Sequence, residues 1–168
     1  NLNVSGGSIS DSQIETGSNL NVSGGSINGS WIDVEGNLYL SGGTININGG
    51  QIEIGKNLIQ SNGYMYISGG ELLVNGDYRI QSEIVDDKGN VTYGDSTGYL
   101  YMRNANDKVF VGGNFITQTR YSHSGLFTNG ILEVKGDFIQ KRNSYYNSAR
   151  NNFYATDNHK TILSGDSI

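Results

Sequence analysis

The chain has 168 residues, a formal net charge of −5, 25 glycines, 21 asparagines and neither proline nor cysteine. The lack of cysteine excludes a disulfide framework and a thiolate metal site, and no apolar run is long enough to predict a membrane span. The charge is uneven, because residues 1–55 hold five acids and no base, whereas the remaining acids and bases balance. Nothing resembles a phosphate-binding surface, so nucleic acid is not an expected partner.

An internal repeat begins at the first residue. The segment Asn1-Leu-Asn-Val-Ser-Gly-Gly-Ser-Ile9 recurs unchanged at 19–27 and, with small changes, at 37–45. The same start returns four more times, at Asn57-Leu58, Asp77-Tyr78, Asn114-Phe115 and Asp137-Phe138. The successive intervals are 18, 18, 20, 20, 37 and 23 residues. A fixed period of this length is typical of a solenoid, and the long interval indicates one coil with an insertion.

Each repeat contains three short segments in which apolar residues alternate with polar ones. The first is the start itself, the second follows the Ser-Gly-Gly turn, and the third ends before a glycine, as in Ile32-Asp-Val34 and Ile52-Glu-Ile54. A period of two places successive side chains on opposite faces of a strand. The sequence therefore predicts an all-β fold, a parallel β-helix or β-solenoid of about seven coils of 18–23 residues, each with three short strands.

The repeat also predicts which side chains fill the interior. Equivalent positions in successive coils should form one column, whose members are Leu20, Leu38, Leu58, Tyr78, Phe115 and Phe138. A single coil buries too little to offset its ordering entropy, so the coils must share burial. We expect one domain over 1–168, with narrow regular coils at 1–56 and wider coils at 57–168. The pattern is incomplete at both ends, which indicates an excised piece of a longer protein.

Two segments interrupt the pattern in the later coils. The insertion 81–98 predicts a hairpin with a Lys-Gly-Asn turn, and its Asp86, Asp87 and Asp95 could supply oxygen ligands, although a solvated hairpin is the simpler expectation. The tail, 143–168, is a candidate cap for the end of the solenoid. Either segment could fold over aromatic side chains of the neighbouring coils.

The second strands of the later coils predict an aromatic face. If Met65 and Leu100 point inward, the flanking tyrosines point outward, and Phe127 in the next coil should join them. The five candidate ligand-binding residues are therefore Tyr64, Tyr66, Tyr99, Tyr101 and Phe127. Aromatic platforms bind sugar rings and protein partners, and an exposed patch of this size is unusual without a partner. The alternative is that the rings are packed beneath the insertion or the tail.

The third strands predict a row of acids in the first coils. Glu15, Asp33 and Glu53 occupy equivalent outward positions and should repel one another. Ca²⁺ could relieve this repulsion, but it prefers six or more oxygen ligands and a flat row supplies few. We expect solvated carboxylates, with these three as weak metal candidates, and no cofactor.

No catalytic motif is present in the sequence. His123 and His159 lie in irregular segments without spaced ligand partners, so surface or capping roles are expected for both. Trp31 and Tyr39 are expected to be isolated surface aromatics. Pectate-lyase-type chemistry would need Arg or Lys among the acids of residues 1–55, and none is there. A water-ordering solenoid face would need ranks of Thr, and only Thr44 fits.

The repeat Asn-Leu-x-Val-Ser-Gly-Gly-(Ser/Thr)-Ile and the segment Gly136-Asp-Phe-Ile-Gln140 resemble the β-helical repeat regions of large bacterial surface and secreted proteins, such as adhesins and autotransporter passengers. This resemblance implies a non-catalytic extracellular module at the cell surface, acting as an adhesive or structural stalk segment. The implied partners are a polysaccharide or a host or cell-surface ligand, and further domains of the same polypeptide. The alternative function is a carbohydrate-binding module that uses the outward tyrosine face.

Overall fold

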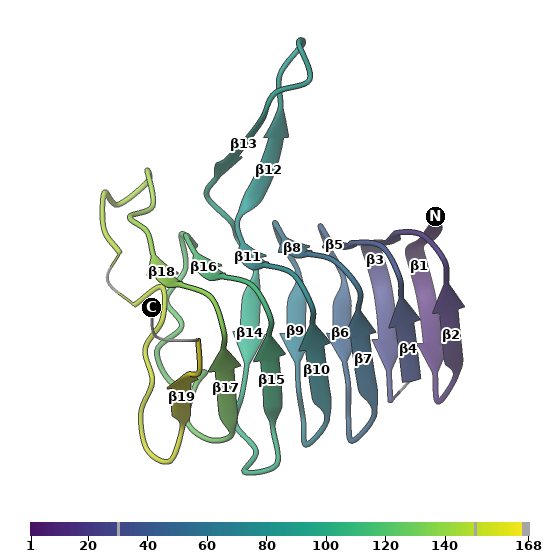
Figure 1. Cartoon of the computed structure of the whole chain (residues 1–168). Helices are drawn as coiled ribbons and strands as arrows, with labels where there is room; N and C mark the ends of the chain where they lie inside the picture. Colours follow the sequence, from purple (N-terminus) through teal and green to yellow (C-terminus); the bar gives the residue numbers. More distant parts are fainter. Residues whose placement is uncertain (30, 150, 166–168) are drawn as a thin grey trace.

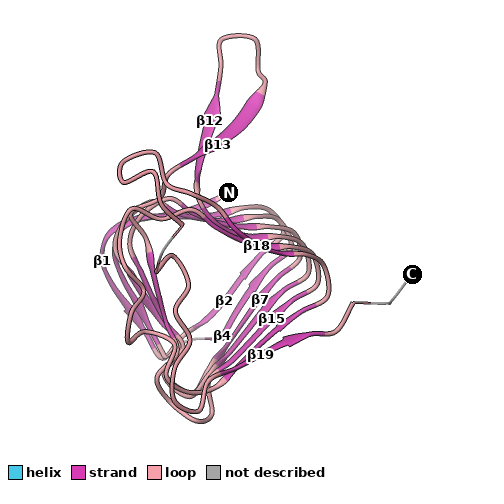
Figure 2. Ribbon diagram, turned by 90° about the vertical axis from the view of Figure 1, so that its left-hand side faces the viewer, coloured by secondary structure: helices cyan, strands magenta, loops and turns pink. Residues whose placement is uncertain are grey.

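The computed structural model describes residues 1–29, 31–149 and 151–165. Within them the chain is all-β and winds into about seven coils stacked along one axis (Figure 1). Viewed along the stack, the coils superimpose around a common interior (Figure 2). The predicted β-solenoid is confirmed. No helix in the described part of the chain is long and apolar enough to cross a membrane.

Three parallel strand faces surround the interior. The first face holds β1 (Leu2–Ser10), β3 (Leu20–Asn28), β5 (Leu38–Leu40), β8 (Leu58–Gln60), β11 (Tyr78–Ile80), β16 (Phe115–Thr117) and β18 (Phe138–Gln140). The second holds β6 (Thr44–Asn46), β9 (Tyr64–Tyr66) and β14 (Tyr99–Tyr101). The third holds β2 (Gln13–Thr16), β4 (Trp31–Val34), β7 (Gln51–Ile54), β10 (Glu71–Val74), β15 (Lys108–Val111), β17 (Ile131–Val134) and β19 (Lys160–Leu163). In the first two coils β1 and β3 run through the Ser-Gly-Gly corner, which joins the first and second faces into one hydrogen-bonded sheet.

The predicted interior column is present in register. The pairing runs from Leu20 through Leu38, Leu58, Tyr78 and Phe115 to Phe138. All of these side chains are fully buried except Phe138, which is half-buried. The same alternation buries the inward residues of the third strands, such as Ile52, Val74 and Val111. Shared burial between neighbouring coils is what allows such short strands to be stable.

The repeated Asn or Asp at each coil start has a structural reason. From Asn19 to Asn114, the Oδ1 of each coil-start residue accepts a hydrogen bond from the backbone N–H of the equivalent residue in the next coil. These bonds measure 2.7–3.0 Å and link Asn19, Asn37, Asn57, Asp77, Asn114 and Asp137. This side-chain ladder satisfies corner N–H groups, and it favours Asn or Asp at every start.

The Ser-Gly-Gly corners need glycine because successive coils approach closely there. Gly25 has a φ of 73°, and a Cβ at this position would lie 2.6 Å from the carbonyl oxygen of Gly7. A larger residue would therefore be strained in backbone conformation and in contact distance. The double glycine keeps the corners stackable.

The insertion forms the predicted hairpin of β12 (Ser82–Val85) and β13 (Val91–Gly94). Figure 1 shows it extending away from the body of the solenoid. Its base lies over the first face, where the Arg79 guanidinium is 4.3 Å from the centre of the Tyr93 ring. Tyr39 also lies there: burial, followed by the charge of Glu83, raises the pKa of its hydroxyl. Tyr39 is thus half-buried rather than the isolated surface aromatic that we expected.

The tail packs against the last coils. Phe153 contacts the rings of Phe115, Phe127 and Phe138, with centroids 4.5–6.1 Å away. The Thr117 hydroxyl donates to the carbonyl of Asn152 at 3.1 Å, and β19 pairs with β17. Residues 150 and 166–168 of the expected cap lie outside the described residues.

Candidate functional site

The predicted tyrosine face exists on the second strands. β9 and β14 pair in register, so Tyr64 lies beside Tyr99 and Tyr66 beside Tyr101. The Tyr64 and Tyr99 rings stack with centroids 5.5 Å apart and planes at 5°, and the Tyr66 and Tyr101 rings stack at 4.2 Å and 18°. Tyr121, which the sequence pattern did not indicate, extends the first stack at 5.4 Å and 7° from Tyr99. We call Tyr64, Tyr66, Tyr99, Tyr101 and Tyr121 the tyrosine ladder.

The ladder rings cover one another. Tyr64 is 42% and Tyr121 47% exposed, whereas the other three are half-buried. In the stack of three, both faces of the central Tyr99 ring are taken by its neighbours, and the outer rings each turn one face away from the stack. The rings are therefore packed mainly by each other. The insertion lies over a different face of the rod, as described above.

The prediction for Phe127 is wrong. Its side chain is fully buried and pairs with Met102, inside the solenoid. The ring contacts Phe153 at 4.5 Å and stacks on His123 at 5.6 Å. Leu126 and Phe127 are adjacent apolar residues, so the alternation fits two registers, and a shift by one residue exchanges inside and outside. The larger ring fills the interior column, while Leu126 is also buried.

A hollow lies at the second stack of the ladder. It is lined by Tyr66, Ser68, Tyr101, Arg103, Asn104 and Asp107. Burial, together with a hydrogen bond to the Tyr66 hydroxyl, raises the pKa of Tyr101 to about 12, although the nearby Arg103 charge opposes the shift. The exposed Arg103 guanidinium is 5.0 Å from the Tyr101 ring centre, and its Nε donates to the Gly125 carbonyl at 2.9 Å. The hollow thus offers two phenols and a guanidinium at one place.

Asp107, which also lines this hollow, holds the fold through hydrogen bonds. Its side chain is buried, and its two oxygens accept backbone N–H groups of Gly69 at 2.5 Å and Asn104 at 2.9 Å. A carboxylate already holding two N–H donors fixes the loop geometry around the hollow. Asp107 therefore fixes the shape of the hollow, and both of its oxygens already accept hydrogen bonds from the backbone.

The expectation of a surface or capping role for His123 is also wrong. The side chain is fully buried between the rings of Tyr99 and Phe127. The Leu100 N–H donates to its Nε2 at 3.3 Å. Burial lowers the pKa of His123 to about 4, so the ring is neutral at pH 7 and works as a packing and hydrogen-bonding group.

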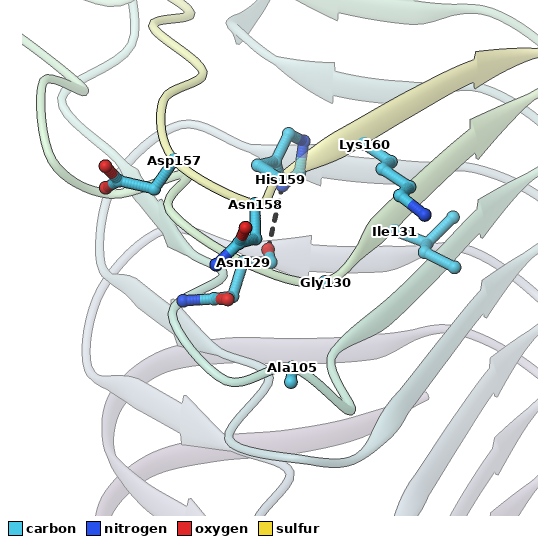
Figure 3. A pocket seen from close by; sticks show the side chains of 8 residues that line it. All are labelled: Ala105, Asn129, Gly130, Ile131, Asp157, Asn158, His159 and Lys160. Atoms are coloured by element: carbon cyan, nitrogen blue, oxygen red, sulfur yellow. Dashed lines mark hydrogen bonds between the residues drawn. The ribbon is translucent and has the colours of Figure 1, made fainter.

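The other histidine lies in a shallow hollow near the C-terminal coil, lined by Ala105, Asn129, Gly130, Ile131, Asp157, Asn158, His159 and Lys160 (Figure 3). His159 is half-buried and its Nδ1 lies 2.8 Å from the Asn129 carbonyl oxygen. Burial lowers its pKa, partly opposed by that hydrogen bond. The Asp157 carboxylate points away from the ring in Figure 3 and takes the Thr156 hydroxyl at 3.1 Å. The two side chains therefore form no acid–base pair here.

Two of the three acids of the insertion, Asp86 and Asp95, make hydrogen bonds that stabilise the fold. Asp86 closes the hairpin turn, because its carboxylate accepts the N–H groups of Lys88 and Asn90 at 2.8 Å. Asp95 is nearly buried and joins the insertion to the tail by accepting from the N–H and hydroxyl of Ser144. Those bonds and Arg120, 3.4 Å away, outweigh burial and lower the pKa of Asp95. Asp87 is exposed.

The predicted row of acids is present on the third face. Glu15 pairs with Asp33 and Asp33 with Glu53, and all three side chains are exposed. They form a single file on a flat surface, and no group of three or more potential metal ligands gathers within residues 1–29, 31–149 and 151–165.

Trp31 stands beside this row and is 59% exposed, as predicted. It is in register with Gln13 and Gln51. Three shallow hollows meet at it, one of which also contains Glu15, Asp33 and Glu53. No aromatic residue occupies the paired positions on either side of it, so its ring is not stacked as the ladder rings are.

Comparison of the chain with known protein families, with curated proteins and with solved structures finds no match.

Proposed function

We propose that this chain is a non-catalytic segment of a large bacterial surface protein and serves outside the cell as an adhesive or structural stalk. The observation that carries the proposal is the continuous in-register stack, whose described ends lie at opposite ends of the rod (Figure 1). A solenoid stabilised by contacts between neighbouring coils suits a spacer that can be joined to further domains.

The buried polar side chains support a structural role. Asp95, Asp107 and Asn143 are each held by hydrogen bonds within the chain, and Gln60 accepts the buried Tyr78 hydroxyl at 2.7 Å. A general acid or base would instead need to meet a substrate with a perturbed pKa in a cleft. The ionisable groups of this interior are used for folding.

Antibodies raised against the folded chain test the location. They should label intact bacteria of the source species, and antibodies pre-absorbed with the chain provide the control. Labelling that appears only after permeabilisation would contradict the proposal. Incubating the chain with a polysaccharide panel tests the absence of catalysis, because release of new reducing ends would overturn it.

A second candidate function, carbohydrate binding at the tyrosine ladder, is favoured by one specific observation. The 42%-exposed Tyr64 ring and the Arg103 hollow lie at the same group of stacked tyrosines. Phenol hydroxyls, a guanidinium and the Asn104 amide can donate hydrogen bonds to sugar oxygens, while the outer ring faces offer stacking area.

Glycan-array binding of three variants tests this candidate. Binding should fall in Tyr64→Ala and in Tyr101→Ala and persist in Tyr146→Ala, whose side chain is 64% exposed but outside the ladder. Retained binding in both ladder variants would remove this face from consideration.

A further inference from the structure

The aromatic side chain of the first coils differs from the ladder in how its ring is used. Trp31 is the only tryptophan of the chain, and its in-register neighbours are the glutamines of β2 and β7. In the residues that the structure describes, no aromatic ring or cation contacts its indole. The ladder rings, by contrast, occupy one another's faces. Trp31 is therefore a large, 59% exposed ring whose faces are not used for stacking within the described chain.

The polar groups around Trp31 are mainly acceptors. Gln13 donates its amide N–H to Glu15 at 2.6 Å, and Gln51 donates to Glu71 at 3.1 Å. The amide oxygens of both glutamines can therefore accept hydrogen bonds from a ligand, as can the exposed carboxylates of Glu15, Asp33 and Glu53. Such a surface matches a ligand rich in hydrogen-bond donors.

The charge around Trp31 selects the sign of the ligand. Residues 1–55 carry five acids and no base. Lys108, which lines one of the three hollows, lies three strands from Trp31 in the same row, with Glu71 between them. An anionic polymer would be repelled. A cation gains from the carboxylates and from the indole, which is the aromatic face that binds cations best.

We infer that the Trp31 face binds a polysaccharide of amino sugars with free amino groups, such as a glucosamine polymer. A pyranose ring lies flat on the indole, its ammonium group meets the carboxylate row, and its hydroxyls donate to the glutamine oxygens. The carboxylates recur once per coil, about 4.8 Å apart, so an extended chain along the rod meets one in each coil. This deepens the adhesive role proposed above and is independent of the ladder.

A lysine-rich peptide has the same charge but fits less well. Each long side chain loses rotamer freedom when it is held in place, whereas a sugar ring carries its ammonium on a rigid frame. The peptide also presents little flat surface for the indole. The sugar polymer is therefore the expected occupant, and the peptide becomes an outcome of the test.

Because Trp31 is the sole tryptophan, its fluorescence reports on this face in the unmodified full chain. Titration with a glucosamine hexamer, at mildly acidic pH and low salt, should change the emission and protect the indole from acrylamide quenching. The N-acetylated hexamer and a uronate oligomer should bind more weakly or not at all. Binding should weaken as salt is raised, since the charges are exposed.

Calorimetry with variants places the ligand. Trp31→Ala should weaken binding of the glucosamine hexamer about tenfold and Asp33→Asn about threefold, with unchanged circular dichroism because both side chains are exposed. Tyr64→Ala should have no effect. Unchanged affinity in Trp31→Ala, or equal binding of a lysine hexapeptide, would overturn the inference. If Tyr64→Ala alone abolished binding, the ladder would be the site and the Trp31 assignment would fail, while the adhesive role would stand.

Discussion

The first three coils and the later coils are built on the same columns but fill them with different side chains. Up to Ile54 the described interior is aliphatic, whereas Tyr78, Phe115 and Phe127 fill it later. The buried polar or charged residues of the described chain all lie from Gln60 onward. Regular short coils close on aliphatic side chains alone, while longer coils with an insertion need rings and satisfied polar groups to fill and fix their interior.

The two regions also differ in how their outward aromatic side chains are packed. The later coils stack their outward tyrosines on one another, which uses ring surface to stabilise the coil that carries the insertion. The first coils leave their single indole unstacked beside three carboxylates. In this chain the outward tyrosines of neighbouring coils therefore stabilise one another by stacking. Trp31, which is not stacked, has more of its ring surface free for a ligand.

The largest expected effect of a single substitution is in the aromatic interior. Phe115→Ala removes a fully buried ring that contacts Tyr78, Phe138 and Phe153. It should lower the free energy of unfolding by about 3–5 kcal/mol. In urea titrations the unfolding midpoint should fall further when it is followed by near-ultraviolet tyrosine circular dichroism than by Trp31 fluorescence. Most tyrosines lie in the later coils, whereas Trp31 lies in the first coils. The control is Phe110→Ala, an outward and half-buried residue at the end of the preceding coil. An equal loss in both variants would contradict the packing.

Acid should weaken the later coils through His123. Its pKa is about 4 in the folded chain and about 6.5 when unfolded. Below pH 6.5 only the unfolded state takes up the proton, so this contribution to stability is complete above that pH and is lost as pH falls toward 4. The loss reaches about 3 kcal/mol. Unfolding titrations of the native chain and His123→Gln across this range measure the difference. Parallel pH profiles for the two proteins would argue against a buried neutral ring.

The tie between the insertion and the tail should be worth less. Asp95→Asn keeps the size of the side chain but removes the charge that Ser144 and Arg120 meet. We expect a loss of about 2 kcal/mol and faster amide hydrogen exchange at 143–149, with unchanged exchange in the first coils. Ser144→Ala, which keeps the backbone donor, should have a smaller effect. Uniform acceleration along the rod would contradict a local tie.

The smallest effect is expected at the coil starts of the regular region. In Asn37→Ala the N–H of Asn57 loses its 3.0 Å acceptor, at a cost of about 1 kcal/mol. Asn37→Asp keeps an acceptor and should retain most of the stability. Thermal unfolding of both variants checks the comparison. An equal loss of stability in the two variants would mean that the hydrogen bond accepted by the Asn37 side chain contributes little.

The sequence predicted the columns because identical spacing forces equivalent residues into the same place, as for Leu20 through Phe138. It also predicted the hairpin and the outward directions of Trp31 and Tyr64. It missed Tyr121 and the burial of His123, because the irregular segment 118–130 has no alternation to read. The adjacent Leu126 and Phe127 show the same limit: two registers satisfy the pattern, and the choice depends on distant residues such as His123 and Phe153, which contact the Phe127 ring.

The register of the whole rod can be measured directly, because the chain has no cysteine. Glu15 and Glu133 lie on the third face, in one row five strand spacings apart. Spin labels on Glu15→Cys and Glu133→Cys should give a narrow distribution of distances centred at about 24 Å. A much longer or broad distribution would contradict a single continuous solenoid that joins the two regions.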